Sequence, residues 1–376
     1  MLAYYGDNVI VNVLGFVDRT IAYLKKIFDR KLKADGSIDP DTFHTNANQL
    51  IKGIEEGFNT TMTNASFRDG RMQLMQRMRR NTFTFIAFKS HSNIAQVVNE
   101  LKDPNGKLRS WPKFKKAALK IDKDYNVNWL KTEYNTAKAS AQMADKWLKI
   151  EKRKDILPWL EYKTQEDDRV RRSHELLNGT IKKVDDPFWD TYYPPNGWGC
   201  RCYVLQHAEA TEKDPEGYPD TKQMPPAFRT NPGKTGKVWN ERHPYFIEAK
   251  ESVKKKIENS MIRIVSDDFR IKAKEALVGK SFTNKNVTFK MTNKAVKSIL
   301  RKPHKDRLIR MDLLDSLEHY FPIAKFIKSV PEEKGRAQIK QWLYYEVIID
   351  GISSFINIAE MASGQYKLHA ITDSIK

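Results

Sequence analysis

The sequence contains few cysteines: two among 376 residues, both within Gly199-Cys200-Arg201-Cys202. Two thiols one residue apart cannot form the disulfide framework of a small secreted protein, so we expect the chain to be made in a reducing compartment. The sequence also lacks any run of about 18 apolar residues, and no basic segment precedes the apolar run at residues 9–17. We therefore expect neither a secretory leader nor a membrane-spanning helix.

Glycine and proline are also scarce, at 17 and 16 residues, which excludes collagen-like and low-complexity chains. With 40% hydrophobic and 30% charged residues, the composition is that of an ordered globular protein of two or three domains. Acidic residues are the minority charge, because 47 Asp and Glu stand against 66 Lys and Arg and leave a formal net charge of +19. This excess favours association with a polyanion without identifying which one.

The apolar pattern divides the chain into regions. Helical spacing predicts a mostly α-helical N-terminal region at 1–105 and a middle region at 106–250. The basic residues that concentrate between 101 and 155 are interpreted either as a nucleic-acid contact or as a solvated helix face. Turn-forming residues fill the segment 185–245, which predicts a loop-rich unit around the cysteines. A linker helix is predicted at 251–276.

Residues 277–376 are predicted to form an α+β domain with a small antiparallel sheet. The segment SFTNKNVTFKMT alternates like a strand, and Thr292 or Asn293 can cap the helix that follows. A further helix is predicted over MDLLDSLEHYFPIAKFI, residues 311–327. Asp350-Gly351 is a strong hairpin signal between two strands, and QYKLHAIT adds another strand.

A metal site is the first functional hypothesis. Thiolates and imidazoles together suit zinc, and His174, Cys200 and Cys202, with His207 or a nearby Asp, would supply four ligands. Because every candidate ligand would be used to close the site, the expected zinc is structural rather than catalytic. The alternative is that both thiols are simply buried while His174 binds a backbone carbonyl.

The middle region carries a series of short motifs in order: Arg171 and His174, Leu177-Asn178-Gly179, Asp185 and Asp186, Pro194-Pro195-Asn196-Gly197-Trp198-Gly199-Cys200-Arg201-Cys202, Phe228, Asn231-Pro232-Gly233, and His243-Pro244-Tyr245. This combination resembles the phage Mu protein F-like family of minor head proteins. The resemblance covers roughly residues 20 to 250 and is most specific between 168 and 204. It implies a role in tailed-phage head morphogenesis, in or on the procapsid near the portal.

The last strands suggest a second hypothesis. Strand alternation predicts that Leu343, Tyr345, Val347 and Ile349 face the helices together with Leu368 and Ala370, and that Glu346, Lys367, His369 and Ile371 share the open face. On neighbouring strands, Glu346 and His369 would form a general base and general acid for RNA cleavage through the 2′-hydroxyl. The alternative is a surface salt bridge.

A basic cluster surrounds His304, and its members are Lys297, Arg301, Lys302, Lys305, Arg307 and Arg310. This cluster is interpreted as a phosphate-binding surface in which His304 and Arg307 assist catalysis, or as a solvated helix end. Two helices followed by a small antiparallel sheet resemble the barnase, EndoU, colicin and RelE-like ribonuclease fold. Phage versions of that fold are associated with Mu F-like head proteins, so the two resemblances support each other.

The leading functional hypothesis is a phage minor capsid protein, associated with the procapsid and portal, whose C-terminal domain is a ribonuclease-like effector. A structural alternative makes that domain an inactive module that binds nucleic acid or the portal, and a third hypothesis is a free-standing host nuclease or toxin. The expected partners are portal and major capsid proteins with packaged DNA or host RNA. The expected location is the virion, in the capsid interior or near the portal, and the host cytoplasm during assembly.

Overall fold

The computed structural model describes residues 8–302 and 304–375, with side chains from residue 18 onward. The chain divides into two compact units, Met1–Met261 and Ile262–Lys376, and the division falls inside helix α10 (Glu251–Leu277). The region boundaries at residues 105, 250 and 276 stay predictions. Within the described residues, no helix is long and apolar enough to cross a membrane.

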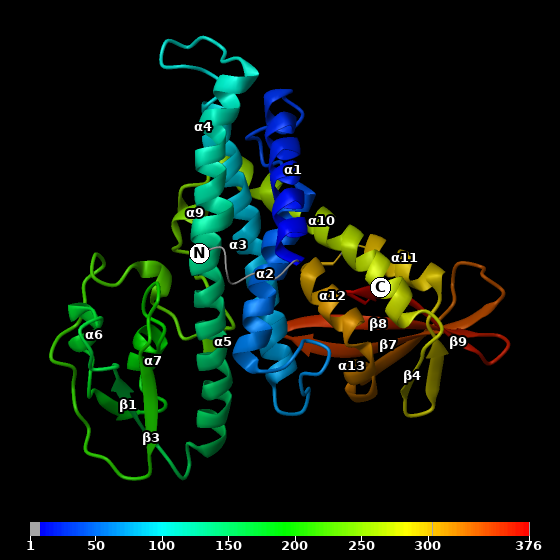
Figure 1. The fold of residues 1–376 in the computed structure, drawn as a ribbon. Coiled ribbons are helices and arrows are strands. Elements are labelled where there is room, and N and C mark those ends of the chain that lie inside the picture. Colours follow the sequence, from blue (N-terminus) through cyan, green and yellow to red (C-terminus); the bar gives the residue numbers. More distant parts are fainter. Residues whose placement is uncertain (1–7, 303, 376) are drawn as a thin grey trace. The chain divides into compact units, whose positions relative to one another are not determined.

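Long helices form the body of the first unit (Figure 1): α1 (Asn8–Phe28), α2 (Pro40–Phe58), α3 (Arg71–Asn99), α4 (Trp111–Lys123) and α5 (Trp129–Arg153). The π-helical turn η1 (Asp124–Asn128) joins α4 to α5. Helix α2 packs closely on α5 because Gly57 has no side chain, and a Cβ atom there would lie 2.5 Å from the Cβ of Ala141. Apolar side chains such as Phe43, Leu50 and Met75 are completely buried between the helices.

A three-stranded antiparallel sheet follows, in the order β2-β1-β3: β1 (Trp159–Lys163), β2 (Ile181–Lys183) and β3 (Tyr203–His207). The short helices α6 (Arg172–Glu175) and α7 (Phe188–Tyr192) lie in its connections. Trp147 of α5 belongs to the same buried cluster as Leu160, Tyr162 and Tyr193. This sheet was missed in the sequence because its strands are three to five residues long and two loops interrupt them.

The proline-rich segment that follows contains three short helices, each with proline in its first turn: η2 (Pro226–Phe228), α8 (Pro232–Thr235) and α9 (Pro244–Ile247). Asn81 of α3 holds this segment, because its side chain accepts hydrogen bonds from the backbone N–H groups of Val238 and Trp239 and donates one to the Trp239 carbonyl. The Trp239 ring stacks on Phe85, with centroids 3.9 Å apart. These contacts fix the backbone of the proline-rich segment to helix α3.

The second unit contains a six-stranded sheet in the order β4-β5-β9-β8-β7-β6. Its strands are β4 (Ser281–Asn284), β5 (Val287–Lys290), β6 (Lys325–Pro331), β7 (Ile339–Ile349), β8 (Ile352–Met361) and β9 (Tyr366–Thr372), and its helices are α11 (Asn293–Arg301), α12 (Arg307–Asp315) and α13 (Leu317–Ile323). All strand pairs are antiparallel except β5 with β9. The predicted fold class is therefore confirmed, with a helical N-terminal and middle region and a C-terminal sheet.

The predicted hairpin at Asp350-Gly351 joins β7 to β8 through a two-residue turn, since Ile349 pairs with Ile352. Both turn residues have positive φ, as a type I′ turn requires. The predicted helix over 311–327 is wrong in two places. It breaks at Ser316 and ends at Ile323, next to Pro322, which has no N–H to continue the helix, and the chain then enters strand β6.

The predicted faces of β9 are also partly wrong. Tyr345 does face the helices, because its ring lies 5.4 Å from that of Phe321. The register, however, pairs Tyr345 with Ile356 and Ile356 with Ile371, which places the fully buried Ile371 on this helix-facing side. The cause is a bulge between β8 and β9, where Asn357 pairs with Ala370 but Ile358 pairs with Leu368. The bulge leaves His369 unpaired and reverses the alternation beyond it.

Candidate metal centre

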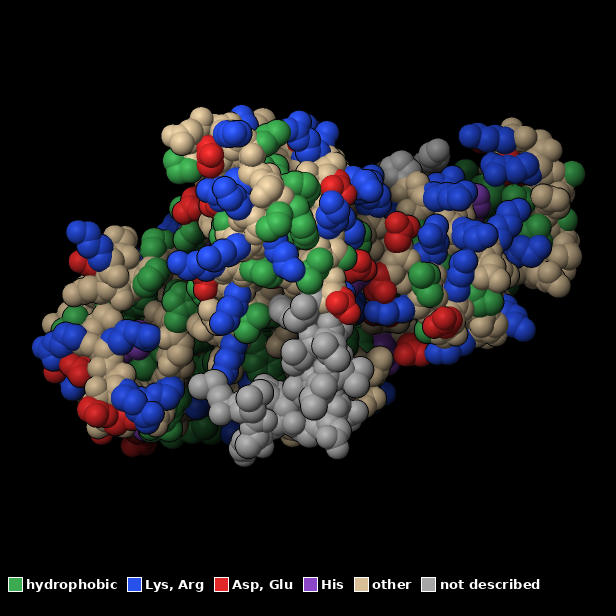
Figure 2. All heavy atoms as spheres, turned by 45° about the horizontal axis from the view of Figure 1, so that its top comes forward, with side chains coloured by type: hydrophobic (Ala, Val, Ile, Leu, Met, Phe, Trp, Pro, Cys, Tyr) green, Lys and Arg blue, Asp and Glu red, His purple; other side chains and the backbone are tan. Residues whose placement is uncertain are grey.

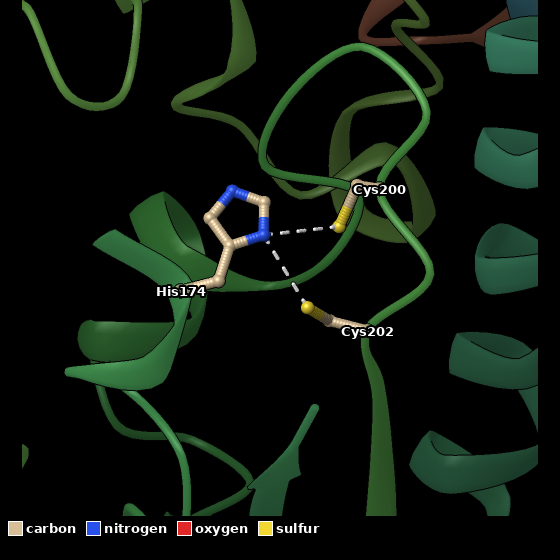
Figure 3. Close-up of side chains that lie close together, drawn as sticks. All are labelled: His174, Cys200 and Cys202. Atoms are coloured by element: carbon tan, nitrogen blue, oxygen red, sulfur yellow. Dashed lines mark hydrogen bonds between the residues drawn. The ribbon is translucent and has the colours of Figure 1, made fainter. Parts of the chain in front are cut away.

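His174, Cys200 and Cys202 come together in the first unit (Figure 3). Nδ1 of His174 lies 3.4 Å from Sγ of Cys202 and 3.8 Å from Sγ of Cys200, and the three candidate ligand atoms all lie within 4.8 Å of one another. Ligands at tetrahedral zinc, bound at about 2.1 to 2.3 Å, are separated by roughly 3.5 to 3.8 Å. The three side chains can therefore hold a metal ion with little rearrangement.

The local sequence explains how the group forms. His174 lies on the one-turn helix α6, and Cys202 immediately precedes strand β3. Gly199 adopts a positive φ of 65°, a conformation that suits glycine and turns the chain between the motif's tryptophan and Cys200. Gly197 lies beside the imidazole, and a Cβ atom there would make an ordinary van der Waals contact, 3.7 Å from Nε2 of His174.

A buried hydrogen bond between Asn196 and Tyr162 stabilises the motif loop, residues 194–202. Both residues are completely buried, and the Tyr162 hydroxyl donates a 2.9 Å hydrogen bond to Oδ1 of Asn196. The guanidinium of Arg171 donates to the Trp198 carbonyl, and Arg201 forms a bidentate ion pair with Asp167 at 2.6 and 2.7 Å. Tyr162 was missed in the sequence because it lies outside the motif, on a strand too short to predict.

The electrostatics of the two thiols differ. A hydrogen bond from Cys202 lowers the pKa of Cys200 well below its ordinary value, and His174 acts in the same direction. The same bond and burial raise the pKa of Cys202. One thiolate stabilised by a neighbouring thiol and an imidazole is suited to bind a soft cation, because metal binding requires deprotonated sulfur.

His207, the fourth predicted ligand, is not brought to the other three. It lies at the far end of β3, and its Nε2 is 3.0 Å from a carboxylate oxygen of Glu161 on the adjacent strand β1. His207 lies five positions beyond Cys202 along the extended chain, a distance of about 17 Å. This part of the prediction is wrong because residues close in sequence were placed on an extended strand. The group as found offers three protein ligands and leaves a fourth position open.

Three further motif residues, Asn178, Asp186 and Asn231, have structural contacts. Asn178 accepts a 2.9 Å bond from the backbone N–H of Thr164, and Asp186 accepts one of 2.7 Å from the N–H of Phe188 at the start of α7. Asn231 caps α8 by accepting from the N–H groups of Gly233 and Lys234. These side chains bind backbone groups that the loops leave without sheet partners.

The predicted acid and base of the second unit do not meet. Strand β8 lies between β7 and β9, so Glu346 and His369 are not on neighbouring strands. Glu346 accepts a 2.8 Å hydrogen bond from Ser353, and across β8 it lies level with Thr372. The His369 ring instead lies 4.8 Å from the ring of Trp342, four residues before Glu346 on β7 and about 13 Å away along the strand.

His304 and Arg307 differ in exposure to solvent. His304 is 7% exposed, its Nε2 lies 3.1 Å from the Ser354 hydroxyl, and its Nδ1 accepts from the N–H of Asp306; burial lowers its pKa. Arg307 is exposed at the start of α12. Arg310, predicted as part of the basic surface, is 1% exposed and donates to the carbonyls of Leu300 and Lys302 at the end of α11. Arg310 therefore stabilises the end of α11 and is not part of an exposed basic surface.

The chain is about half helical, and its middle region carries a loop-rich site of thiol and imidazole groups. Residues 46–205 match the family described as Phage Mu protein F like protein. The chain is 43% identical over 75 residues to the Mu-like prophage FluMu F protein of Haemophilus influenzae, and 36% identical over 85 residues to the putative capsid assembly protein F of Escherichia phage Mu. This segment is therefore similar to the Phage Mu protein F-like family.

The similarity is confined to part of each protein. The two alignments cover 20% and 23% of this chain, and the chain spans about a fifth of each relative, 18% and 19% of their lengths. No solved structure matches this chain.

Proposed function

We propose that the protein is a phage head morphogenesis protein, a minor capsid component that assembles with the procapsid near the portal. The observation that carries the proposal is the family match over residues 46–205, which contains the whole His/Cys group and both helices α3 and α5. One of the two relatives is named as a putative capsid assembly protein. The side chains of Asn178, Asp186 and Asn231 also support an assembly role, because they bind backbone groups and so stabilise the loops.

Purified heads test this proposal. The protein is expected in procapsids isolated from infected or induced cells, at a few to a few tens of copies per particle, with portal and major capsid proteins. Quantitative mass spectrometry of gradient fractions gives the copy number. Recovery only in the free cytosolic fraction, with none in heads, would contradict the proposal and favour the free-standing nuclease or toxin.

The metal in this proposal is structural zinc. His174, Cys200 and Cys202 would hold it, and the bound ion would tie helix α6, the motif loop and strand β3 to one another. The open fourth position would be filled by water or by a group from a partner chain. The protein's own contribution is to hold two sulfurs and an imidazole at the required spacing in a mostly buried site.

For the second unit, we propose a nucleic-acid-binding module rather than a ribonuclease. The separation of Glu346 from His369 and the burial of His304 support this choice. Four basic side chains near α11 and α12 are exposed and form no ion pair with any described residue: Lys297, Arg301, Lys305 and Arg307. Such a surface suits phosphates. Incubation of the full chain with RNA is expected to give no product, and cleavage that His369→Ala abolishes would support the ribonuclease instead.

Packaged DNA is the polyanion that fits a head protein, and helix α4 offers a second surface for it. Lys113, Lys116, Lys120 and Lys123 recur at three- and four-residue intervals, so they follow one side of the helix. All four are exposed, and none forms an ion pair with a described residue. Lys and Arg side chains are spread over much of the face shown in Figure 2, in keeping with the net charge of +19.

A further inference from the structure

An aromatic pocket of about 620 Å³ opens in the first unit, and its lining does not include His174, Cys200 or Cys202. Its lining residues come from α5, the motif loop and the proline-rich segment: Trp129, Thr132, Glu133, Trp198, Pro225, Ala227, Phe228, His243, Pro244 and Tyr245. The volume falls within the range of ligand pockets in proteins, and Trp129 keeps 42% of its surface exposed at this site. Exposed tryptophan beside a formed pocket is typical of a binding site.

The pocket has no net charge. Its carboxylate, Glu133, is 2% exposed and forms an ion pair with Lys89, which is 1% exposed. Burial and Lys89 lower the pKa of His243 to about 4, so this ring is neutral at pH 7. A cation attracted by the aromatic faces would find no unpaired carboxylate among the lining residues, because Glu133 is already paired with Lys89. Charge complementarity therefore favours an uncharged occupant, although the chain as a whole is strongly basic.

The pocket contains several hydrogen-bond donors, and the hydroxyl groups of Thr132 and Tyr245 can also accept. Nδ1 of His243 accepts the N–H of Tyr245 at 3.3 Å, so in the neutral ring Nε2 carries the proton. Nε2 of His243, the indole N–H groups of Trp129 and Trp198 and the Tyr245 hydroxyl have no acceptor among the described residues. The one carboxylate is already used by Lys89. An occupant that supplies carbonyl acceptors fits the indole and imidazole N–H groups.

We infer that the pocket binds an extended, proline-containing segment of a partner protein. Proline residues supply flat apolar rings for the tryptophan and tyrosine faces, accept through their carbonyls and have no N–H that needs an acceptor. An extended proline segment is also ordered before it binds, which lowers the entropy cost of docking. The inference does not depend on the role of the protein in heads.

Calorimetric titration of the full chain with an acetylated, amidated decaproline peptide tests the inference. Saturable binding at one site per chain is expected, and no binding of choline or of a glycine-serine decapeptide. Trp129→Ala should weaken decaproline binding at least about tenfold, as expected for an aromatic anchor. Tyr218→Ala is the matched control, because Tyr218 is 60% exposed outside the pocket and should leave the dissociation constant unchanged.

Trp129→Phe separates the two contributions, since it keeps an aromatic face and removes the indole donor. It should bind more weakly than the wild type and more tightly than Trp129→Ala. Circular dichroism confirms that the variants are folded. Absence of decaproline binding, an unchanged dissociation constant in Trp129→Ala, or choline binding as tight as decaproline would each overturn the inference.

Discussion

Gly233 lies so close to Trp147 that a Cβ atom on the glycine would overlap the Cβ atom of the tryptophan. The contact joins α8, in the proline-rich segment, to the C-terminal half of α5. Gly233→Ala is therefore expected to destabilise the first unit by about 1 to 3 kcal/mol, because well-packed interiors tolerate added methyl groups poorly. Chemical denaturation measures the change in the free energy of unfolding.

Gly217→Ala is the matched control for this substitution. The nearest atom to a Cβ on Gly217 is a Leu176 side-chain carbon at 3.6 Å, which is an ordinary van der Waals distance. It should change the free energy of unfolding by less than about 0.5 kcal/mol. Equal effects of the two substitutions would show that the contact with Trp147 is not tight in solution.

Metal binding should depend on the three residues that the fold brings together. Elemental analysis of protein prepared with zinc is expected to give about one ion per chain, and Cys200→Ser or His174→Ala should lose it and lower the melting temperature, because binding is coupled to folding. His207→Gln should keep the metal, since His207 contacts Glu161 instead. If the wild-type protein binds no zinc and its melting temperature is the same with and without zinc, the alternative of two buried thiols would stand.

Stability should fall in acid partly through His243. Burial lowers the folded-state pKa of His243 to about 4, whereas an unfolded histidine has a pKa of about 6.5. Between these values the unfolded chain binds more protons, so the stabilisation present above pH 6.5 is lost as the pH falls toward 4. His243→Asn keeps an N-cap acceptor for Tyr245 and should reduce this slope by up to about 1.4 kcal/mol per pH unit. Identical slopes between pH 7 and 5 would argue against it.

The buried ion pair between Lys89 and Glu133 should be costly to break on one side only. Glu133→Gln leaves a buried ammonium without its carboxylate, and the expected loss of stability is about 3 to 5 kcal/mol. The double variant Lys89→Met/Glu133→Leu removes both charges and should be much closer to the wild type. A double variant as unstable as Glu133→Gln would mean that packing, rather than charge, determines the loss.

The four exposed lysines of α4 should contribute to DNA affinity through phosphates. In one variant, Gln replaces Lys113, Lys116, Lys120 and Lys123. The slope of log affinity against log salt concentration should become less negative by about 3.6, which is 0.9 for each phosphate that a lysine no longer neutralises. Fluorescence anisotropy with duplex DNA measures the slope. The control replaces four surface lysines that already have carboxylate partners: Lys25, Lys138, Lys149 and Lys237. A slope equal in both variants would exclude α4 as the DNA-binding surface.

Local signals in the sequence predicted much of the fold. Residue spacing predicted the long amphipathic helices, and the preference of Asp-Gly for positive φ predicted the turn at Asp350-Gly351. Thr292 caps α11 as expected. The bulge at His369 could not be predicted, because an extra residue in one strand depends on the partner strand. Strand order is equally non-local, and it is strand order that separates Glu346 from His369.

The His/Cys group was also predicted only in part from the sequence. Chemistry identified His174, Cys200 and Cys202, since few other residue types in the segment suit a soft metal. The exclusion of His207 required knowing that β3 is extended and pairs with β1. The aromatic pocket was missed altogether, because its walls come from segments up to about a hundred residues apart, each of which by itself has the pattern of core or turn.

Strand β6 ends the six-stranded sheet with one side unpaired, and most of its residues are exposed. An open edge of this kind is a template on which a second chain can add a strand and begin a fibril. Here Lys325 and Lys328 place positive charges on the edge, a bulge interrupts its register after Phe326, and Pro331 closes it without a hydrogen-bond donor. Copies of this protein crowded at high local concentration would therefore repel one another along this edge.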